Sequence, residues 1–293
     1  MTNPYRGRFA PSPTGRLHFG SLVAALGSWL HARHAGGAWV VRIEDIDPWR
    51  EVPGAAADIQ RTLAAFGMIS DEPVVHQRRR RDVYLQARER LERQGLAYRC
   101  WCSRSDLAPF DGRHPAACVA PPRHRPPAWR LRAPTSPVEF VDEVQGAFVQ
   151  DVARDVGDFV IWRADNIVAY HLAVVVDDAA QGITDVVRGA DLLDSTPRQI
   201  ALMRALELPI PRHAHLPLAL DAQGRKLGKH DAALPVDAID PLPVLHRALR
   251  FLGQDVPEAG TVDRVLDEAA RAFDARRIPS VHGRFAAMQN DHP

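Results

Sequence analysis

The sequence predicts an α/β fold in which helices cover a parallel sheet. An apolar run that ends at Phe9 leads into a turn rich in proline and glycine. The residues after the turn repeat apolar side chains at the spacing of a helix: Leu22, Ala25, Leu26, Trp29 and Leu30. Gly36 and Gly37 then precede a second apolar run, residues 38–43. Strand, helix and strand in this order are typical of a parallel sheet with helical connections.

The turn at residues 10–21 has the composition of an anion-binding helix start. Backbone N–H groups at a helix N-terminus point toward a bound anion, and a nucleotide phosphate fits there. His18 lies at this start, where a histidine more often caps or packs than reacts. Lys226 and Lys229 share a later glycine-containing loop, after a predicted strand at residues 215–220. Two mobile cations in such a loop can lie beside a triphosphate.

The composition indicates a globular protein of ordinary kind, since 46% of the 293 residues are hydrophobic and 25% are charged. The 37 Lys and Arg residues against 36 Asp and Glu give a net charge of +1, which neither requires nor excludes a nucleic-acid partner. We find no apolar run of the roughly 18 residues that a membrane span needs, and no signal-peptide pattern. We therefore expect a cytoplasmic protein with no membrane partner.

The arginine run at residues 78–81 has two interpretations. It opens a predicted helix with an apolar stripe at Val83, Ala87 and Leu91, so a solvated helix face is one. Contact between one or two of these arginines and RNA phosphates is the other.

All three cysteines lie in one short window. Cys100, Cys102 and Cys118, together with His114, supply the four ligands of a tetrahedral zinc ion. The odd number and the clustering favour a metal in a reducing compartment over disulfides. The alternative is three cysteines packed as small hydrophobic side chains. Because the surrounding residues are proline-rich, we expect a small zinc-stabilised insert there.

Regular patterning resumes after the insert. Apolar runs at residues 158–162, 170–176 and 183–187 precede Ser195 and Thr196, where a capping hydroxyl before Pro197 predicts a helix start. Leucines from Leu242 onward predict two or three short helices at the end of the chain.

Five motifs in order resemble those of the class I aminoacyl-tRNA synthetases, in the glutamyl branch. Residues 18–21 (HFGS) resemble the HIGH signature and residues 226–230 (KLGKH) resemble the KMSKS signature. Ser21 replaces the second histidine of the first signature, and Gly228 replaces the serine of the second. The segments at residues 41–47, 170–173 and 185–189 are similar to glutamyl-enzyme motifs.

The resemblance implies a Rossmann-type class I core that activates glutamate with ATP and Mg²⁺, forming an adenylate. The core is expected at residues 1–97 and 129–233, the zinc insert at 98–128, and a short helical region at 234–293. The implied catalytic residues are His18, Lys226 and Lys229. The implied ATP-binding residues are His18, Gly20, Ser21 and Lys229. The implied glutamate-binding residues are Arg8, Phe9, Ala10, Pro11, Ser12, Glu44, Tyr170 and Arg188.

Guanidinium groups suit the carboxylates of glutamate, and an acidic group suits its ammonium. We therefore expect Arg188 to bind the side-chain carboxylate and Glu44 the ammonium, although each would more often form a surface ion pair.

The length of the stretch after the KMSKS-like loop indicates which type of glutamyl-branch enzyme the sequence resembles. Only 63 residues follow His230, too few for the anticodon-binding region of a full glutamyl enzyme. The arrangement resembles shortened members that activate glutamate without tRNA and transfer it to queuosine in the anticodon stem-loop of tRNA(Asp). Two alternatives stay open: a truncated glutamyl-tRNA synthetase that charges a tRNA 3′ end, and a non-catalytic module that binds zinc and RNA.

Overall fold

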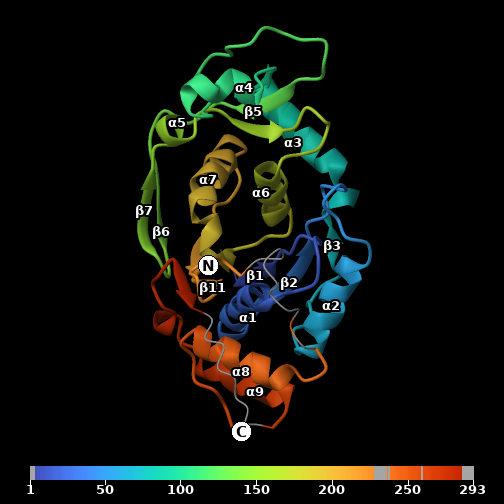
Figure 1. Ribbon diagram of the computed structural model, residues 1–293, viewed down its shortest axis with the longest axis vertical. Coiled ribbons are helices and arrows are strands. Elements are labelled where there is room, and N and C mark those ends of the chain that lie inside the picture. The colour runs from blue at the N-terminus through green and yellow to red at the C-terminus, as the bar shows by residue number, and fades with distance from the viewer. Residues whose placement is uncertain (1–3, 228–235, 237, 259, 286–293) are drawn as a thin grey trace.

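A seven-stranded sheet lies across the middle of the elongated molecule (Figure 1). The computed structural model describes residues 4–227, 236, 238–258 and 260–285. The strand order is β3-β2-β1-β9-β10-β6-β7, and every neighbouring pair is parallel except the hairpin of β6 and β7. The bounds are β1 Arg6–Phe9, β2 Ala38–Ile43, β3 Val75–His76, β6 Val138–Asp142, β7 Gly146–Gln150, β9 Asp185–Gly189 and β10 Arg212–Leu216. From β1 the chain continues to β2 on one side, and β9 pairs on the other, so the strand order reverses there.

The longer helices flank this sheet and the smaller one described below. They are α1 Phe19–His34, α2 Ala55–Ala65, α3 Arg81–Arg93, α6 Tyr170–Ala180, α7 Thr196–Ala205, α8 Pro241–Phe251 and α9 Val262–Ala272. Two short helices, α4 Arg104–Leu107 and α5 Val152–Asp155, lie toward the upper end of Figure 1. Short 3₁₀ segments are η1 Gln77–Arg79, η2 Ala108–Phe110, η3 Ala190–Ser195 and η4 Ala275–Arg277. None of the helices in these described ranges is long and apolar enough to cross a membrane.

Helix α1 is buried on nearly all sides because it lies between the central sheet and helices α8 and α9 (Figure 1). Leu22, Leu26 and Leu30 are fully buried, as their spacing predicts. The helix ends before Gly36, which has the left-handed φ of 62°. A Cβ at Gly37 would lie 2.3 Å from the carbonyl oxygen of Tyr5, so only glycine lets β2 begin this close to β1.

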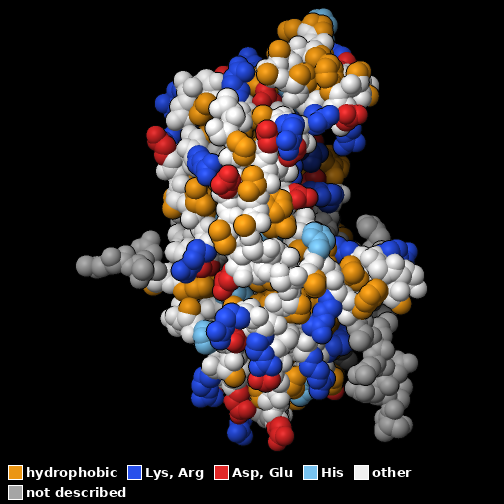
Figure 2. Space-filling view, turned by 90° about the vertical axis from the view of Figure 1, so that its left-hand side faces the viewer, with side chains coloured by type: hydrophobic (Ala, Val, Ile, Leu, Met, Phe, Trp, Pro, Cys, Tyr) orange, Lys and Arg blue, Asp and Glu red, His pale blue; other side chains and the backbone are white. Residues whose placement is uncertain are grey.

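A second hydrophobic cluster supports the upper half of the molecule. Strands β4 Ala97–Cys100, β5 Ala128–Leu131 and β8 Phe159–Trp162 form an antiparallel sheet that packs with α3, α6 and α7. The cysteine-bearing segment leaves from Cys100 and returns at Ala128, and these two residues pair across β4 and β5. Strands β11 Leu218–Leu220 and β12 Gly283–Phe285 pair in parallel beside the central sheet. Charged side chains of both signs are interspersed on the face shown in Figure 2.

Two local expectations were wrong. Val83 was expected on the apolar stripe of α3 but is exposed, and Tyr84 is buried instead, whereas Leu91 is buried and Ala87 is half-buried against the same cluster. Ser195 makes no side-chain cap for α7, because η3 already continues helical backbone into it.

Candidate active site

A cavity of about 230 Å³ opens at the carboxyl ends of β1, β2, β9 and β10. This is where the strand order reverses, the usual position of a ligand site in an open parallel sheet. Lys229 lies outside the described residues. The other residues predicted to bind ATP or glutamate all line this cavity: Arg8, Phe9, Ala10, Pro11, Ser12, His18, Gly20, Ser21, Glu44, Tyr170, Arg188 and Lys226.

The helix start beside the cavity is capped by His18. Its Nδ1 accepts a hydrogen bond from the backbone N–H of Ser21 at 3.3 Å, and its Nε2 lies 3.1 Å from Ser21 Oγ. This arrangement leaves Nε2 as the protonated nitrogen. His18, Gly20 and Ser21 line the same wall of the cavity, at the N-terminus of α1 where backbone N–H groups favour anions.

Lys226 also lines the cavity, and its Nζ forms an ion pair with Asp191 Oδ2 at 2.5 Å. Both side chains are partly exposed. Asp191 was not expected at the site, and it holds the lysine beside the cavity until an anion competes for it.

Arg188 is buried, and it donates to His215, to Thr196 and to the carbonyl oxygen of Leu192. Its Nε donates to His215 Nε2 at 3.0 Å, and its Nη2 donates to Thr196 Oγ1 at 2.7 Å. Because an arginine only donates, His215 accepts at Nε2 and donates its Nδ1–H to Asp142 Oδ2 at 2.5 Å. Burial lowers the pKa of His215, although Asp142 opposes the shift, so the imidazole is neutral.

This network leaves one nitrogen of Arg188 for a ligand. Arg188 Nη1 is buried and has no hydrogen-bond partner within the described ranges. An unpaired buried donor on a charged group is costly, and a bound carboxylate would satisfy it.

An arginine-carboxylate cluster lies next to the cavity, and its members Arg8 and Glu44 line it. Asp178 Oδ1 lies 3.3 Å from Arg8 Nε and 2.8 Å from Arg42 Nη1, and Arg42 Nη2 lies 3.3 Å from Glu44 Oε1. Burial raises the pKa of Glu44 to about 7, although Arg42 and Arg8 oppose the shift. Glu44 therefore gains or loses its proton near neutral pH, and a ligand cation would favour the ionised form.

Sequence reasoning missed the residues that hold these side chains. Asp177 and Asp178 carry a weak signal, two acids within a buried helical run, but the sequence does not say that they bind arginines. Asp177 accepts from Gln77, Arg80 and Tyr84, so Arg80 of the arginine run points inward. The remaining residues missed are Arg42, Asp142, Asp191, Thr196 and His215.

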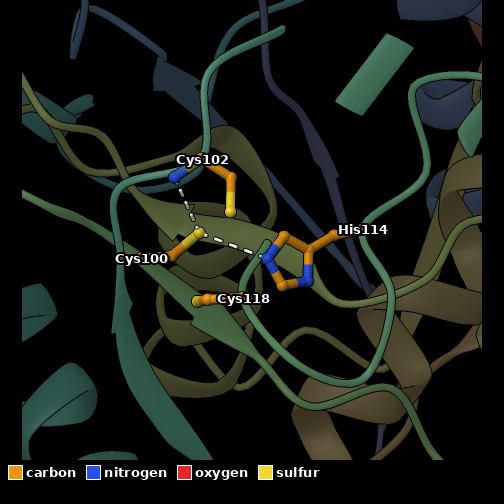
Figure 3. Close-up of side chains that lie close together, drawn as sticks. All are labelled: Cys100, Cys102, His114 and Cys118. Atoms are coloured by element: carbon orange, nitrogen blue, oxygen red, sulfur yellow. Dashed lines mark hydrogen bonds between the residues drawn. The ribbon is translucent and has the colours of Figure 1, made fainter. Parts of the chain in front are cut away.

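The cysteine-bearing segment forms a separate cluster at the upper end of the molecule. Figure 3 shows three sulfur atoms and one imidazole around a common centre, and all four ligand atoms lie within 4.8 Å of one another. Ligands of a tetrahedral zinc ion are about 3.8 Å apart when the Zn–S distance is about 2.3 Å. The residues therefore fit a closed zinc site: Cys100, Cys102, His114 and Cys118.

Tyr98 and Asp158 orient the imidazole of the cluster from the side away from the sulfur atoms. Tyr98 Oη donates to Asp158 Oδ2 at 2.6 Å and lies 3.1 Å from His114 Nδ1. Tyr98 therefore accepts from Nδ1–H, and the lone pair of His114 Nε2 faces the sulfur atoms, with Cys100 Sγ at 3.3 Å. This second layer of hydrogen bonds is typical of metal-binding histidines.

The sequence matches the family described as tRNA synthetases class I (E and Q), catalytic domain, over residues 5–117 and 122–249. It is 59% identical to a glutamyl-Q tRNA(Asp) synthetase of Xanthomonas axonopodis pv. citri, over 94% of this chain and 93% of that protein. A protein of the same name from Dechloromonas aromatica is 53% identical, over 88% and 89%. The solved glutamate tRNA ligase of Elizabethkingia meningosepticum, in complex with its amino acid, has a TM-score of 0.81 at 26% identity, covering 97% of this chain and 67% of that one.

Proposed function

The chain belongs to the class I tRNA synthetases for glutamate and glutamine and is a ligase of that family, and we propose that it activates glutamate without tRNA and transfers it to queuosine in tRNA(Asp). The observation that carries the choice of amino acid is Arg188, whose buried Nη1 is unpartnered among the described residues. A side-chain carboxylate completes its hydrogen bonding. Glu44, on the wall across from it, accepts the ammonium.

The first step is attack of a glutamate α-carboxylate oxygen on the α-phosphorus of ATP. A P–O bond to the nucleotide forms, the bond to pyrophosphate breaks, and glutamyl-adenylate results. The protein supplies no nucleophile, so positioning and charge stabilisation provide the acceleration. Mg²⁺ bound to the phosphates would neutralise part of their charge.

We assign the phosphate contacts to the two ends of the cavity. His18, Gly20 and Ser21 line it from the start of α1, and phosphate oxygens would replace Ser21 as the partner of His18 Nε2–H. Lys226 exchanges Asp191 for phosphate oxygens, and Lys229, assigned from the sequence alone, joins it. We propose Arg8, Phe9, Ala10, Pro11, Ser12 and Tyr170 as the remaining walls of the glutamate subsite.

In the second step, a hydroxyl of the queuosine ring attacks the carbonyl carbon of the adenylate. The new ester bond forms as AMP leaves with the bridging oxygen, and the hydroxyl proton passes to the leaving phosphate or to solvent. The names of relatives that are 53–59% identical over most of their length support this acceptor.

We further propose that Cys100, Cys102, His114 and Cys118 hold one structural zinc ion. With four protein ligands the metal has no open position, so it stabilises its segment and takes no part in the chemistry. The division into a core at 1–97 and 129–233, an insert at 98–128 and a helical region at 234–293 follows from this assignment. We place the reaction in the cytoplasm.

The experiment has two parts. In the first, the protein is incubated with labelled glutamate, ATP and tRNA(Asp) with or without queuosine, and transfer of the label to the tRNA is measured. In the second, ATP–pyrophosphate exchange is measured without tRNA. The proposal expects exchange without tRNA and transfer only to the queuosine-containing tRNA. Transfer to both tRNAs would indicate a synthetase that charges the 3′ end. Absence of exchange by folded protein would indicate a non-catalytic module.

A further inference from the structure

One tryptophan has an environment unlike that of most others in the chain. Trp49 is 85% exposed, whereas four of the six are buried: Trp29, Trp39, Trp129 and Trp162. A single exposed apolar residue is ordinary on a protein surface. Whether the exposed ring of Trp49 serves binding depends on its position in the structure and on how firmly its backbone is held.

The turn that carries Trp49 is fixed by polar contacts. Asp47 Oδ1 accepts from the backbone N–H of Trp49 at 3.2 Å, and Asp47 Oδ2 pairs with Arg50 at 3.0 Å and with Arg163 at 2.9 Å. The backbone N–H of Val52 donates to the carbonyl of Pro13 at 2.9 Å, which ties the turn to the segment just after Ser12 of the main cavity. The backbone that carries the ring is therefore anchored, which lowers the entropy lost when a partner binds it.

This turn lies at the rim of the glutamate subsite. A cavity of about 30 Å³ lies between residues 12–14 and residues 44–51. It shares Ser12, Glu44 and Tyr170 with the main cavity. Under the proposed function Glu44 binds the ammonium next to the glutamyl carbonyl, so the acceptor comes close to this rim and to the Trp49 turn.

We propose that Trp49 is a stacking platform for an unpaired nucleobase of the RNA loop that receives glutamate, an inference that rests on the proposed function. RNA loops present unstacked bases, and proteins bind these on aromatic faces. The ring binds through stacking rather than through phosphate attraction, because the arginines at this rim already pair with carboxylates: Arg50 and Arg163 with Asp47, and Arg78 with Asp45 and Glu51.

The test compares Trp49→Ala and Trp49→Phe with wild type and with Val149→Ala. Val149 is 60% exposed on β7, at the opposite end of the central sheet, and controls for loss of exposed apolar surface. Exchange without tRNA should be unchanged in all four proteins. In Trp49→Ala the KM for queuosine-containing tRNA(Asp), and its Kd, should rise roughly fivefold to a hundredfold, the range for one lost stacking contact.

Trp49→Phe should keep most of the affinity and lose most of the tryptophan fluorescence quenching that the tRNA causes in wild type. The loss in Trp49→Ala should also persist at high salt, since the contact is not ionic. Wild-type KM and Kd in Trp49→Ala, or equal losses in Val149→Ala, would overturn the inference. Failure of wild type to transfer glutamate would contradict the proposed function instead, and the Kd of the variants for the same tRNA would still decide the role of Trp49.

Discussion

The buried hydroxyl group of Thr196 stabilises the orientation of Arg188. It accepts a hydrogen bond from Arg188 Nη2 and also lies within hydrogen-bonding distance of His215 Nε2. Replacing Thr196 by valine keeps the branched shape and removes the bond to Arg188 Nη2. A hydrogen bond to a charged group is worth about 1.5 kcal/mol or more, so the KM for glutamate in pyrophosphate exchange should rise roughly tenfold. The kcat should change little, because the hydrogen bond is made equally in the ground state and in the transition state.

Thr196→Ser is the matched control for this prediction, since it keeps the hydroxyl and loses only a methyl group. It should bind glutamate nearly as wild type does. Equal KM values for the valine and serine variants would show that the hydroxyl does not position Arg188.

If Glu44 binds the ammonium as proposed, glutamate binding should depend on pH. The pKa of Glu44 is raised to about 7 by burial, so its carboxyl group is protonated below that pH and cannot accept from an ammonium with full charge. Affinity should therefore fall as the pH drops from 8 to 6 and level off above pH 8. Calorimetric titration with glutamate at several pH values across this range measures the affinity.

The variant Glu44→Gln should bind weakly at every pH and show no such slope. A slope that persists in this variant would assign the titration to another group. Buffers of different ionisation enthalpy add a check, because binding near pH 7 should release protons from Glu44.

At the scale of residues, the sequence indicated the groups that face the cavity better than those that hold them. Glu44, Tyr170 and Arg188 lie in motifs, and the structure places them along one cavity, while their roles stay predictions. Asp142 and His215 belong to β6 and β10, which are 73 residues apart in sequence. Their contact depends on which strands pair, and no local pattern encodes that.

At the scale of elements, Gly157 allows the segment before β8 to contact the His114 backbone. Its φ is 74°, and a Cβ there would lie 2.2 Å from the carbonyl oxygen of His114. Gly157→Ala should therefore displace His114 and lower both zinc content and Tm. The steric overlap should cost about 2 kcal/mol beyond the backbone strain.

Gly146→Ala separates the two effects. Gly146 has a similar φ of 82°, but nothing lies within 4 Å of its Cβ position. This variant should lose only the roughly 1–2 kcal/mol of a left-handed alanine and keep its zinc. Equal zinc loss in both variants, measured by metal analysis of purified protein, would contradict the steric account.

Elements with a strong apolar periodicity could be predicted from the sequence. Contacts made by polar side chains with residues distant in the sequence could not. The apolar repeat of α1 and the run at residues 38–43 match the observed helix and strand because the large apolar side chains of both are buried. Thr196 illustrates the opposite case. Its hydroxyl fits a helix cap by sequence, but the tertiary structure assigns it to Arg188.

At the scale of the molecule, the cavity lies between two hydrophobic clusters. One joins α1 to the central sheet, α8 and α9, and the other joins β5 and β8 to α3, α6 and α7. Phe9 belongs to the first cluster, and Leu172, two residues beyond Tyr170, belongs to the second. The position of Tyr170 opposite β1 therefore depends on how the two halves pack.

The proposed zinc site lies beyond the second cluster and contributes no side chain to the cavity. Removing the metal with a chelator should unfold the segment at residues 101–127, because it has few buried apolar residues of its own. Strands β5 and β8 keep their packing on α3 and α6, so pyrophosphate exchange should persist. Hydrogen exchange should show lost protection in that segment and retained protection in β8 and α6. Exchange activity that disappears in proportion to zinc release would mean instead that the metal holds the upper cluster, and through it Tyr170, in place.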